Sequence, residues 1–432
     1  MPVSSFSGLN LALSGLMANQ RALDITGHNI ANAGTVGYTR QEAVLAASPS
    51  LTVPQGTYES GAGIQLGQGV DLKSIRRIRD QFLDLQVRAQ NLSLGQDSVT
   101  SDALSRVEDI LQEPGDNGLN ALLGKFWSAW QDLASHPESA AAKEAVAGQA
   151  ATLADAFNTL AGRMDSIAAD ATNGAAQIVA VGGPVDQIAK ELGVLNDAIS
   201  RAVAAGTQPN DQLDRRDVLL DQLSKLGRVS VADLGGGVIE VSFGGAATPI
   251  VSGPTVTWPQ ALSSPGGQIG GLQDVAAKIT GYRAGLDQVA SDLASTVNAL
   301  HPTPVFSGAT AGALTAVVTP ATVRATSAVN AGANDVAKAI AGLRGGLAER
   351  GYNDLVSRIG GDAATARAGE ATATAVLNQL EERRQEVAGV SLDEELTNMM
   401  RFQRGYQAAS RVMTTMDETL DALINRTGRV GL

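Results

Sequence analysis

Apolar residues recur at alternating steps of three and four at both ends of this chain, and no other feature constrains the fold more. Such spacing predicts two long helices, each with one continuous apolar stripe. The first is expected from about Phe6 to Ala31, and the second begins at a capping box, Ser391–Glu394, and stops at Gly428. The N-terminal stripe consists of Phe6, Leu9, Leu13, Leu16, Gln20, Leu23, Gly27 and Ile30. The C-terminal stripe consists of Leu392, Leu396, Met399, Phe402, Tyr406, Ala409, Met413, Met416, Leu420 and Leu423.

Each stripe needs a partner, because burial of one Leu, Ile or Met contributes about 1.5–3 kcal/mol while an isolated helix is marginal in water. Two arrangements fit this requirement. The terminal helices pack on each other within one molecule, or their apolar residues are left for neighbouring subunits. The candidate subunit-interaction residues are Leu9, Leu13, Leu16, Leu23, Ile30, Leu396, Met399, Phe402, Tyr406, Met413, Met416, Leu420 and Leu423.

Charge and composition argue against several classes of protein. The 432 residues carry 44 carboxylates against 32 Lys and Arg, and a net charge of −12 does not suit binding to nucleic-acid phosphates. With no Cys and 3 His, no metal site or thiol nucleophile is expected. The glycines at 61–69 lack the spacing of a dinucleotide loop, so no cofactor is expected. Neither a membrane span nor a cleaved signal peptide is apparent.

Between the two ends the spacing of apolar residues changes. Residues 80–206 have helical spacing with breaks at Pro and Gly, and a further helix is expected from about Asp211 to Leu226. Alternation around the glycines at 235–237 predicts a hairpin, followed by strands at 250–258 and a helix from about Leu272 to Leu300. The expected fold is mainly α with an inserted β domain, an elongated multi-domain stalk whose N- and C-terminal helices pair as a coiled coil.

Three domains follow from this order of elements. We predict a terminal coiled-coil domain from residues 1–45 and 385–432, and a helical rod-like domain from residues 46–227 and 331–384. An outer β-rich domain with an intervening helix is predicted at 228–330. The segments Asp214–Asp217 and Glu381–Arg384 mix acidic and basic residues within one turn, as a solvated helix face does, and are interpreted as such.

Short motifs at both ends resemble a known group of proteins. Residues 14–16, 23–32 and 37–41 are similar to the N-terminal signature of the bacterial flagellar axial proteins, which include rod, hook and hook-associated proteins. Residues 389–396, 403–408 and 411–413 resemble the matching C-terminal signature. The signature residues are Asn29, Ala31, Asn32, Gly37, Tyr38, Arg40 and Gln41.

The middle of the chain narrows the resemblance. Residues 210–223 and 119–135 are similar to helices of the hook-associated protein 1 family, which forms the hook–filament junction. This resemblance implies a non-enzymatic structural subunit of the flagellum, exported through the flagellar apparatus without a cleaved signal and located outside the cell. The implied partners are copies of itself, hook protein, a second junction protein or flagellin, and an export chaperone, with no nucleic acid and no membrane insertion.

Alternative functions follow from the same sequence. The segment Gly34–Gly37 is closer to that of a hook protein, so a hook or distal-rod protein is the first alternative. A soluble acidic helical binding module or chaperone is an alternative from another class. An enzyme within the β domain is the third, and it would require a polar pocket with convergent titratable groups.

Overall fold

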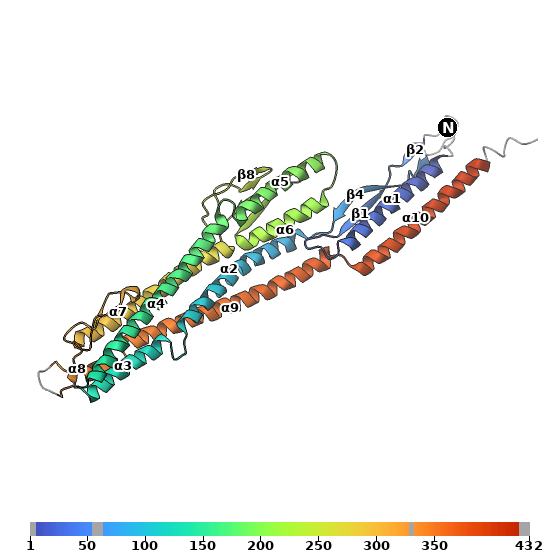
Figure 1. The fold of residues 1–432 in the computed structure, drawn as a ribbon. Helices are drawn as coiled ribbons and strands as arrows, with labels where there is room; N and C mark the ends of the chain where they lie inside the picture. Colours follow the sequence, from blue (N-terminus) through green and yellow to red (C-terminus); the bar gives the residue numbers. More distant parts are fainter. Residues whose placement is uncertain (1–5, 54–63, 328–331, 423–432) are drawn as a thin grey trace, which may run out of the picture.

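The computed structural model describes residues 6–53, 64–327 and 332–422, and it is an elongated, mainly helical molecule (Figure 1). The first half contains α1 Phe6–Ala31, β1 Gln41–Ala47, β2 Leu51–Val53, β3 Ile64–Leu66, β4 Val70–Arg77, α2 Gln81–Leu111, α3 Leu119–Ser135, α4 Ala140–Val179, α5 Pro184–Ala204 and α6 Asn210–Leu226. The second half contains β5 Val229–Gly235, β6 Val238–Phe243, β7 Val251–Ser252, β8 Thr255–Val256, α7 Gly267–Leu300, β9 Phe306–Ser307, β10 Thr315–Ala316, α8 Asp335–Ala341, α9 Leu347–Ala388 and α10 Leu392–Asp421. The predicted fold class, mainly α with a small β part in an elongated stalk, is confirmed.

The two terminal helices lie side by side at one end of the molecule and run antiparallel (Figure 1). Their contacts keep one register, because each step forward along α1 is matched by an equal step back along α10. Small residues set the spacing: a Cβ built on Gly15 would lie 3.8 Å from the Cβ of Ala409. The pairs that define the register are Gly8 with Met416, Gly15 with Ala409, Asn19 with Gly405, and Asn29 with Glu395. Interlocking of side chains in coiled-coil geometry along this pair stays a prediction.

The face of α1 that meets α10 lies one residue before the predicted stripe. It carries Gly8, Ala12, Gly15, Asn19, Ala22, Thr26 and Asn29, of which Ala12, Ala22, Thr26 and Asn29 are buried. One residue is a rotation of about 100°, so Leu13, 39% exposed, lies on the flank of this face. The predicted leucine stripe and this row of small residues have the same period along α1. The small residues face α10 because they let the two backbones approach closely.

The C-terminal stripe lies closer to its predicted position. Partly buried residues on α10 are Met399, Phe402, Ala409, Met413, Met416 and Leu420. Leu396 and Tyr406 are exposed instead, and Leu423 lies outside the described residues. The two helices therefore cover only part of each other's apolar surface.

An antiparallel β1–β4 hairpin covers another flank of α1 (Figure 1). Its register places Gln41 opposite Arg77 and Ala47 opposite Val70. The hairpin approaches the helix closely at its far end, where Ser14 Oγ accepts a hydrogen bond of 3.3 Å from the Val70 amide. Residues 46–77 were predicted within the helical domain, and the strands in this segment differ from that expectation.

Two apolar cores fill the body of the molecule. One packs α2, α3, α4, α7, α8 and α9 together with residues 305–325 around the rings of Phe126 and Trp130. The other joins α5 and α6 to an antiparallel sheet of order β5-β6-β7-β8. The hairpin predicted at the glycines 235–237 is present, as are strands within 250–258 and the helix after 266. Residues 305–325, predicted with the outer β domain, pack with the helices instead, while the domain boundaries themselves stay a prediction.

A buried histidine ties one loop of the first core to the end of α7. His301 contacts the Thr303 carbonyl with Nδ1 at 2.6 Å and accepts the Arg324 amide proton with Nε2 at 2.9 Å. Burial lowers the pKa of His301 below its ordinary value of 6.5. The hydrogen bond to Thr303 raises the pKa by less than burial lowers it, and the charge of Arg324 also lowers it. The ring is therefore neutral in the folded chain, with its proton on Nδ1.

Substitution of Gly405 by Ala is expected to lower the free energy of unfolding by about 1–3 kcal/mol, as overpacking does. The added methyl would lie 2.4 Å from Asn19 Oδ1, and the Asn19 amide is already hydrogen-bonded to the Gly15 carbonyl. Thermal unfolding and limited proteolysis measure the effect. The control is Gly27→Ala on the same helix pair, where the new Cβ meets nothing within 4 Å. Equal behaviour of the two variants would mean that close approach does not hold the pair.

The stability of the chain is expected to fall as pH drops below 6.5, and part of this loss comes from His301. Below that pH the unfolded chain gains a proton at this residue, whereas the folded chain does not until a lower pH, so unfolding is favoured. Urea midpoints at pH 7 and pH 5 measure it. His301→Gln should reduce the difference between the two midpoints, and the exposed His136, changed in the same way, should leave it intact.

Candidate functional site

Asn29, buried near the end of α1, satisfies all of its hydrogen-bonding groups within one polar joint. Its Oδ1 accepts from the Gln41 amide at 3.0 Å and from the Tyr38 hydroxyl at 2.7 Å. Its Nδ2 donates to the Gln41 carbonyl at 2.8 Å and to Glu395 Oε2 at 3.1 Å. Residues of the N-terminal signature that were predicted only by resemblance thus meet the first turn of α10.

Arg40 lies where the two connections between the helix pair and the body cross. One connection, Ile78–Asp80, leads from β4 to α2, and the other, Gly389–Ser391, leads from α9 to α10. The Arg40 amide donates to the Ala388 carbonyl, and the Arg40 carbonyl accepts from the Ile78 amide, both at 2.9 Å. Its main chain therefore holds both connections at once.

The Arg40 side chain also holds the start of α10. Its Nε donates to Glu395 Oε1 and its Nη1 to Glu394 Oε2, both at 2.7 Å. The Glu395 side chain is 3% exposed, so this ion pair is shielded from water. The predicted capping box is half present: Ser391 Oγ accepts from the Glu394 amide, but the Glu394 carboxylate binds Arg40.

The loop between α1 and β1 follows a path that requires glycine at Gly37. Its φ is +81°, and a Cβ there would lie 2.2 Å from Cγ2 of Val218 on α6. Asn32 accepts from the Thr35 hydroxyl within the same loop, and Ala31 is exposed. Burial, with the charges of nearby carboxylates, raises the pKa of Tyr38, so its hydroxyl keeps the proton that it donates to Asn29.

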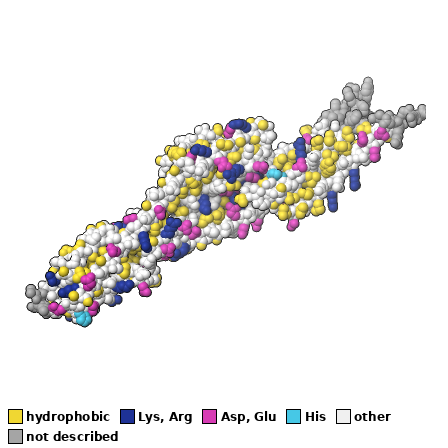
Figure 2. Space-filling model, in the orientation of Figure 1, with side chains coloured by type: hydrophobic (Ala, Val, Ile, Leu, Met, Phe, Trp, Pro, Cys, Tyr) yellow, Lys and Arg dark blue, Asp and Glu magenta, His cyan; other side chains and the backbone are white. Residues whose placement is uncertain are grey.

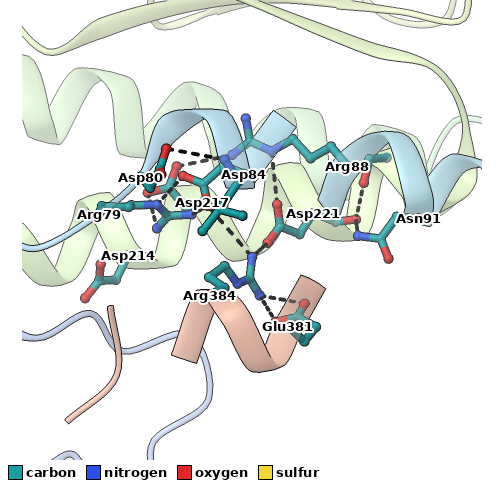
Figure 3. A network of polar contacts seen from close by, with 12 residues as sticks. Arg79, Asp80, Asp84, Arg88, Asn91, Asp214, Asp217, Asp221, Glu381 and Arg384 are labelled. Atoms are coloured by element: carbon teal, nitrogen blue, oxygen red, sulfur yellow. Dashed lines mark hydrogen bonds and ion pairs between the residues drawn. The ribbon is translucent and has the colours of Figure 1, made fainter. Parts of the chain in front are cut away.

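A second polar cluster lies behind the joint, on one face of α6 (Figure 3). Asp214, Asp217 and Asp221 are three and four residues apart, so they point to the same side of the helix. Four arginines from separate segments converge on them: Arg77 of β4, Arg79 of the following loop, Arg88 of α2 and Arg384 of α9. The shortest contacts are 2.6 Å from Arg384 to Asp221 and 2.7 Å from Arg79 to Asp217.

These ion pairs are largely shielded from solvent. The arginine side chains are between 12% and 24% exposed, and the three aspartates between 8% and 16%. Although burial alone lowers the pKa of Arg79, its hydrogen bond to Asp84 and the charge of Asp217 raise it overall. The interpretation of Asp214, Asp217 and Arg384 as parts of solvated helix faces is wrong. No local signal distinguishes them, because their partners are distant in sequence.

The helix pair exposes large apolar side chains that the rest of the described chain leaves uncovered. Figure 2 shows hydrophobic side chains gathered over α1 and α10. Leu13 and Leu396 are 39% and 50% exposed, and Leu9, Leu16, Leu23 and Ile30 are partly buried on the same flank of α1. The other exposed large residues of the pair are Leu11, Met17, Leu392, Met400, Tyr406 and Val412.

The described residues hold no cluster of three or more His, Cys, Asp or Glu side chains arranged to bind a metal ion. None of the helices in the described ranges is long and apolar enough to cross a membrane. The two notable features of the described residues are the ion pairs at the joint and the exposed apolar side chains on the helix pair.

Comparison with known families matches three parts of the chain. Residues 9–39 match the family described as flagella basal body rod protein, and residues 382–426 match the C-terminal region of the flagellar basal body rod FlgEFG proteins. Residues 104–265 match the helical domain of flagellar hook-associated protein FlgK. The first two matches coincide with α1, α10 and the joint, and the third with the body.

Full-length relatives carry one name. The chain is 30% identical to flagellar hook-associated protein 1 of Bacillus subtilis, over 98% of this chain and 99% of that one. It is 26% identical to the Escherichia coli protein of the same name, over 96% and 99% of the two chains. A solved structure of the flagellar hook junction protein FlgK from Burkholderia pseudomallei has 19% identity and a TM-score of 0.44, covering 51% of this chain and 46% of that one.

The terminal helix pair and its two matching families define a flagellar axial protein of the rod and hook class. The helical domain and the full-length relatives are more specific. This chain belongs to the flagellar hook-associated protein 1 family.

Substitution of Asp217 by Asn is expected to destabilise the fold by about 3 kcal/mol, because it leaves shielded guanidinium groups without a counter-charge. Asp217 accepts from Arg77, Arg79 and Arg88. Urea unfolding followed by circular dichroism measures the change. The control is Glu191→Gln, which breaks an exposed pair with Arg215 and should cost less than about 1 kcal/mol. Equal losses would contradict the assignment of the cluster as a structural element.

Proposed function

We propose that this chain is a non-enzymatic structural subunit that forms the junction between hook and filament in the bacterial flagellum. Family membership supports the flagellar assignment, and full-length similarity to hook-associated protein 1 favours the junction over a hook or distal-rod protein. The single structural observation that carries the assembly role is the apolar surface left open on α1 and α10.

Neighbouring subunits cover this surface in the proposed assembly. Each leucine removed from water contributes about 1.5–3 kcal/mol, so a stripe of them supplies a large part of the association energy. Contacts between copies in a tubular structure are heterologous, because such contacts close a ring or continue as a helix, whereas an isologous contact ends with a dimer.

The proposed partners follow from this position. Copies of the same chain lie beside each other, hook protein lies below, and a second junction protein or flagellin lies above. An export chaperone binds the chain before assembly, and the chain is exported through the flagellar apparatus without a cleaved signal to its place outside the cell. Nucleic acid, cofactors and membrane insertion have no part in this function.

Loss of assembly without loss of folding is expected for the double variant Leu13→Asp and Leu396→Asp, because both side chains are exposed in the single chain. In a strain that lacks the wild-type chain, we expect hooks to form and flagellin to be shed as monomers. The wild-type chain should restore filaments and the double variant should not. Filament counts by electron microscopy and flagellin in the culture medium measure this.

The control is Leu347→Asp, an exposed leucine at the first turn of α9, away from the helix pair, which should restore filaments. Circular dichroism checks that all variants fold. Normal filaments with the double variant would remove the apolar surface from the mechanism. Loss of the hook itself in the deletion strain would move the assignment to a hook or rod protein.

A further inference from the structure

A cavity of about 820 Å³ opens at the joint between the helix pair and the body. The loop that follows α1, including Gly34 and Val36, lines one side, and the last turns of α9, including Gln385 and Glu386, line another. Asp217, Val218 and Asp221 of α6 also line it. The end of the terminal helix pair and the end of α9 are thus separated by open space over part of their approach.

The contacts around this cavity prevent some movements of the loop that follows α1 and leave others open. Gly37 rests directly on Val218, so the loop cannot move closer to α6 at this point. The Thr39 amide is hydrogen-bonded to Asp214 at 3.0 Å, which holds the loop at a fixed distance from α6. The adjoining strands are also bound to this region of the body, through Gln41, Ile75 and Arg77. A rotation that keeps these contacts would displace the loop into the cavity instead of into packed atoms.

Arg40 is placed to oppose that rotation. Its main chain binds both connections between the two parts of the molecule, and its side chain binds the first turn of α10. Any change of angle between α9 and α10 stretches at least one of these hydrogen bonds. Because Glu395 is buried and its carboxylate also accepts from Asn29, the ion pair cannot be replaced by water without cost.

We propose that the joint is a latched hinge. The contact of Gly37 with Val218 is the pivot, and the cavity is the space into which the helix pair moves. The Arg40 ion pairs with Glu394 and Glu395 are the latch, which holds the angle between α9 and α10 seen in this structure. The role of such a hinge rests on the proposed function. A subunit between hook and filament contacts two different assemblies, so it would present its helix pair at more than one angle.

Spin labels on two added cysteines test the hinge, because the chain has no native Cys. Gln379 on α9 and Gln407 on α10 are exposed and lie on either side of the joint. In the otherwise wild-type chain, pulsed electron paramagnetic resonance should give one narrow distance distribution. With Arg40→Gln added, the distribution should broaden toward shorter distances.

Two further variants make the result specific. Arg76→Gln removes the exposed ion pair between Arg76 of β4 and Glu42 of β1, and it should leave the distance distribution narrow. Gly34→Phe, whose new side chain starts from a lining position with no atom within 4 Å, should occupy part of the cavity and narrow the distance distribution again in the Arg40→Gln chain. An unchanged distribution in Arg40→Gln overturns the latch, and failure of Gly34→Phe to narrow it overturns the cavity as the space for movement.

The unlabelled chain with the two added cysteines is also expressed in the deletion strain and tested for filament formation. If this chain restores filaments while Arg40→Gln leaves the distance distribution unchanged, the hinge is wrong and the junction role stands. If it fails to restore filaments while Arg40→Gln broadens the distribution, the hinge stands and the proposed function is in question.

Discussion

The Arg40 guanidinium lies against two carboxylates of α10 while its main chain binds both connections to the body, so this residue ties the helix pair to the body at one point. Contacts of Gln41, Ile75 and Arg77 with the start of α6 and the residues just before it hold the neighbouring strands to the body as well. A guanidinium suits the position because its donors point in fixed directions and it stays charged when shielded from water. Asn29 completes the arrangement by binding Glu395 from the other side. The joint is therefore specified by directional polar contacts, and apolar packing supplies the cohesion of the parts on either side.

Small residues at the α1–α10 contact have a consequence for assembly. Gly15, Ala409 and Gly405 allow the helices to approach closely, so the wider leucine side chains of α1 lie on the flank. A pair that buried its leucines internally would be more stable alone and would have less apolar surface to offer. The close approach of the small residues thus leaves Leu11, Leu13 and Met17 of α1 exposed, and the proposed assembly would use this surface.

Helix α6 organises the body as the joint organises the helix pair. One face carries the aspartates that bind arginines of β4, α2 and α9, and the other packs Leu219, Leu220 and Leu223 into the core beside the four-stranded sheet. The sequence of this segment resembles a helix of the family, and its structure gives a physical reason for that pattern. Acidic residues three and four positions apart suit this face because arginines from four separate segments meet there.

Spacing and residue chemistry along the chain were enough to predict α1 and the start of α10, the helical body and the hairpin at 235–237. These features depend on neighbours three, four or two residues away, and local periodicity records such contacts. The face that α1 turns toward α10, the strands at 41–77, the burial of Asp217 and the meeting of Asn29, Arg40 and Glu395 were not predictable in this way. Each of them depends on a partner distant in sequence, and two stripes with the same period cannot be told apart until the opposing surface is known.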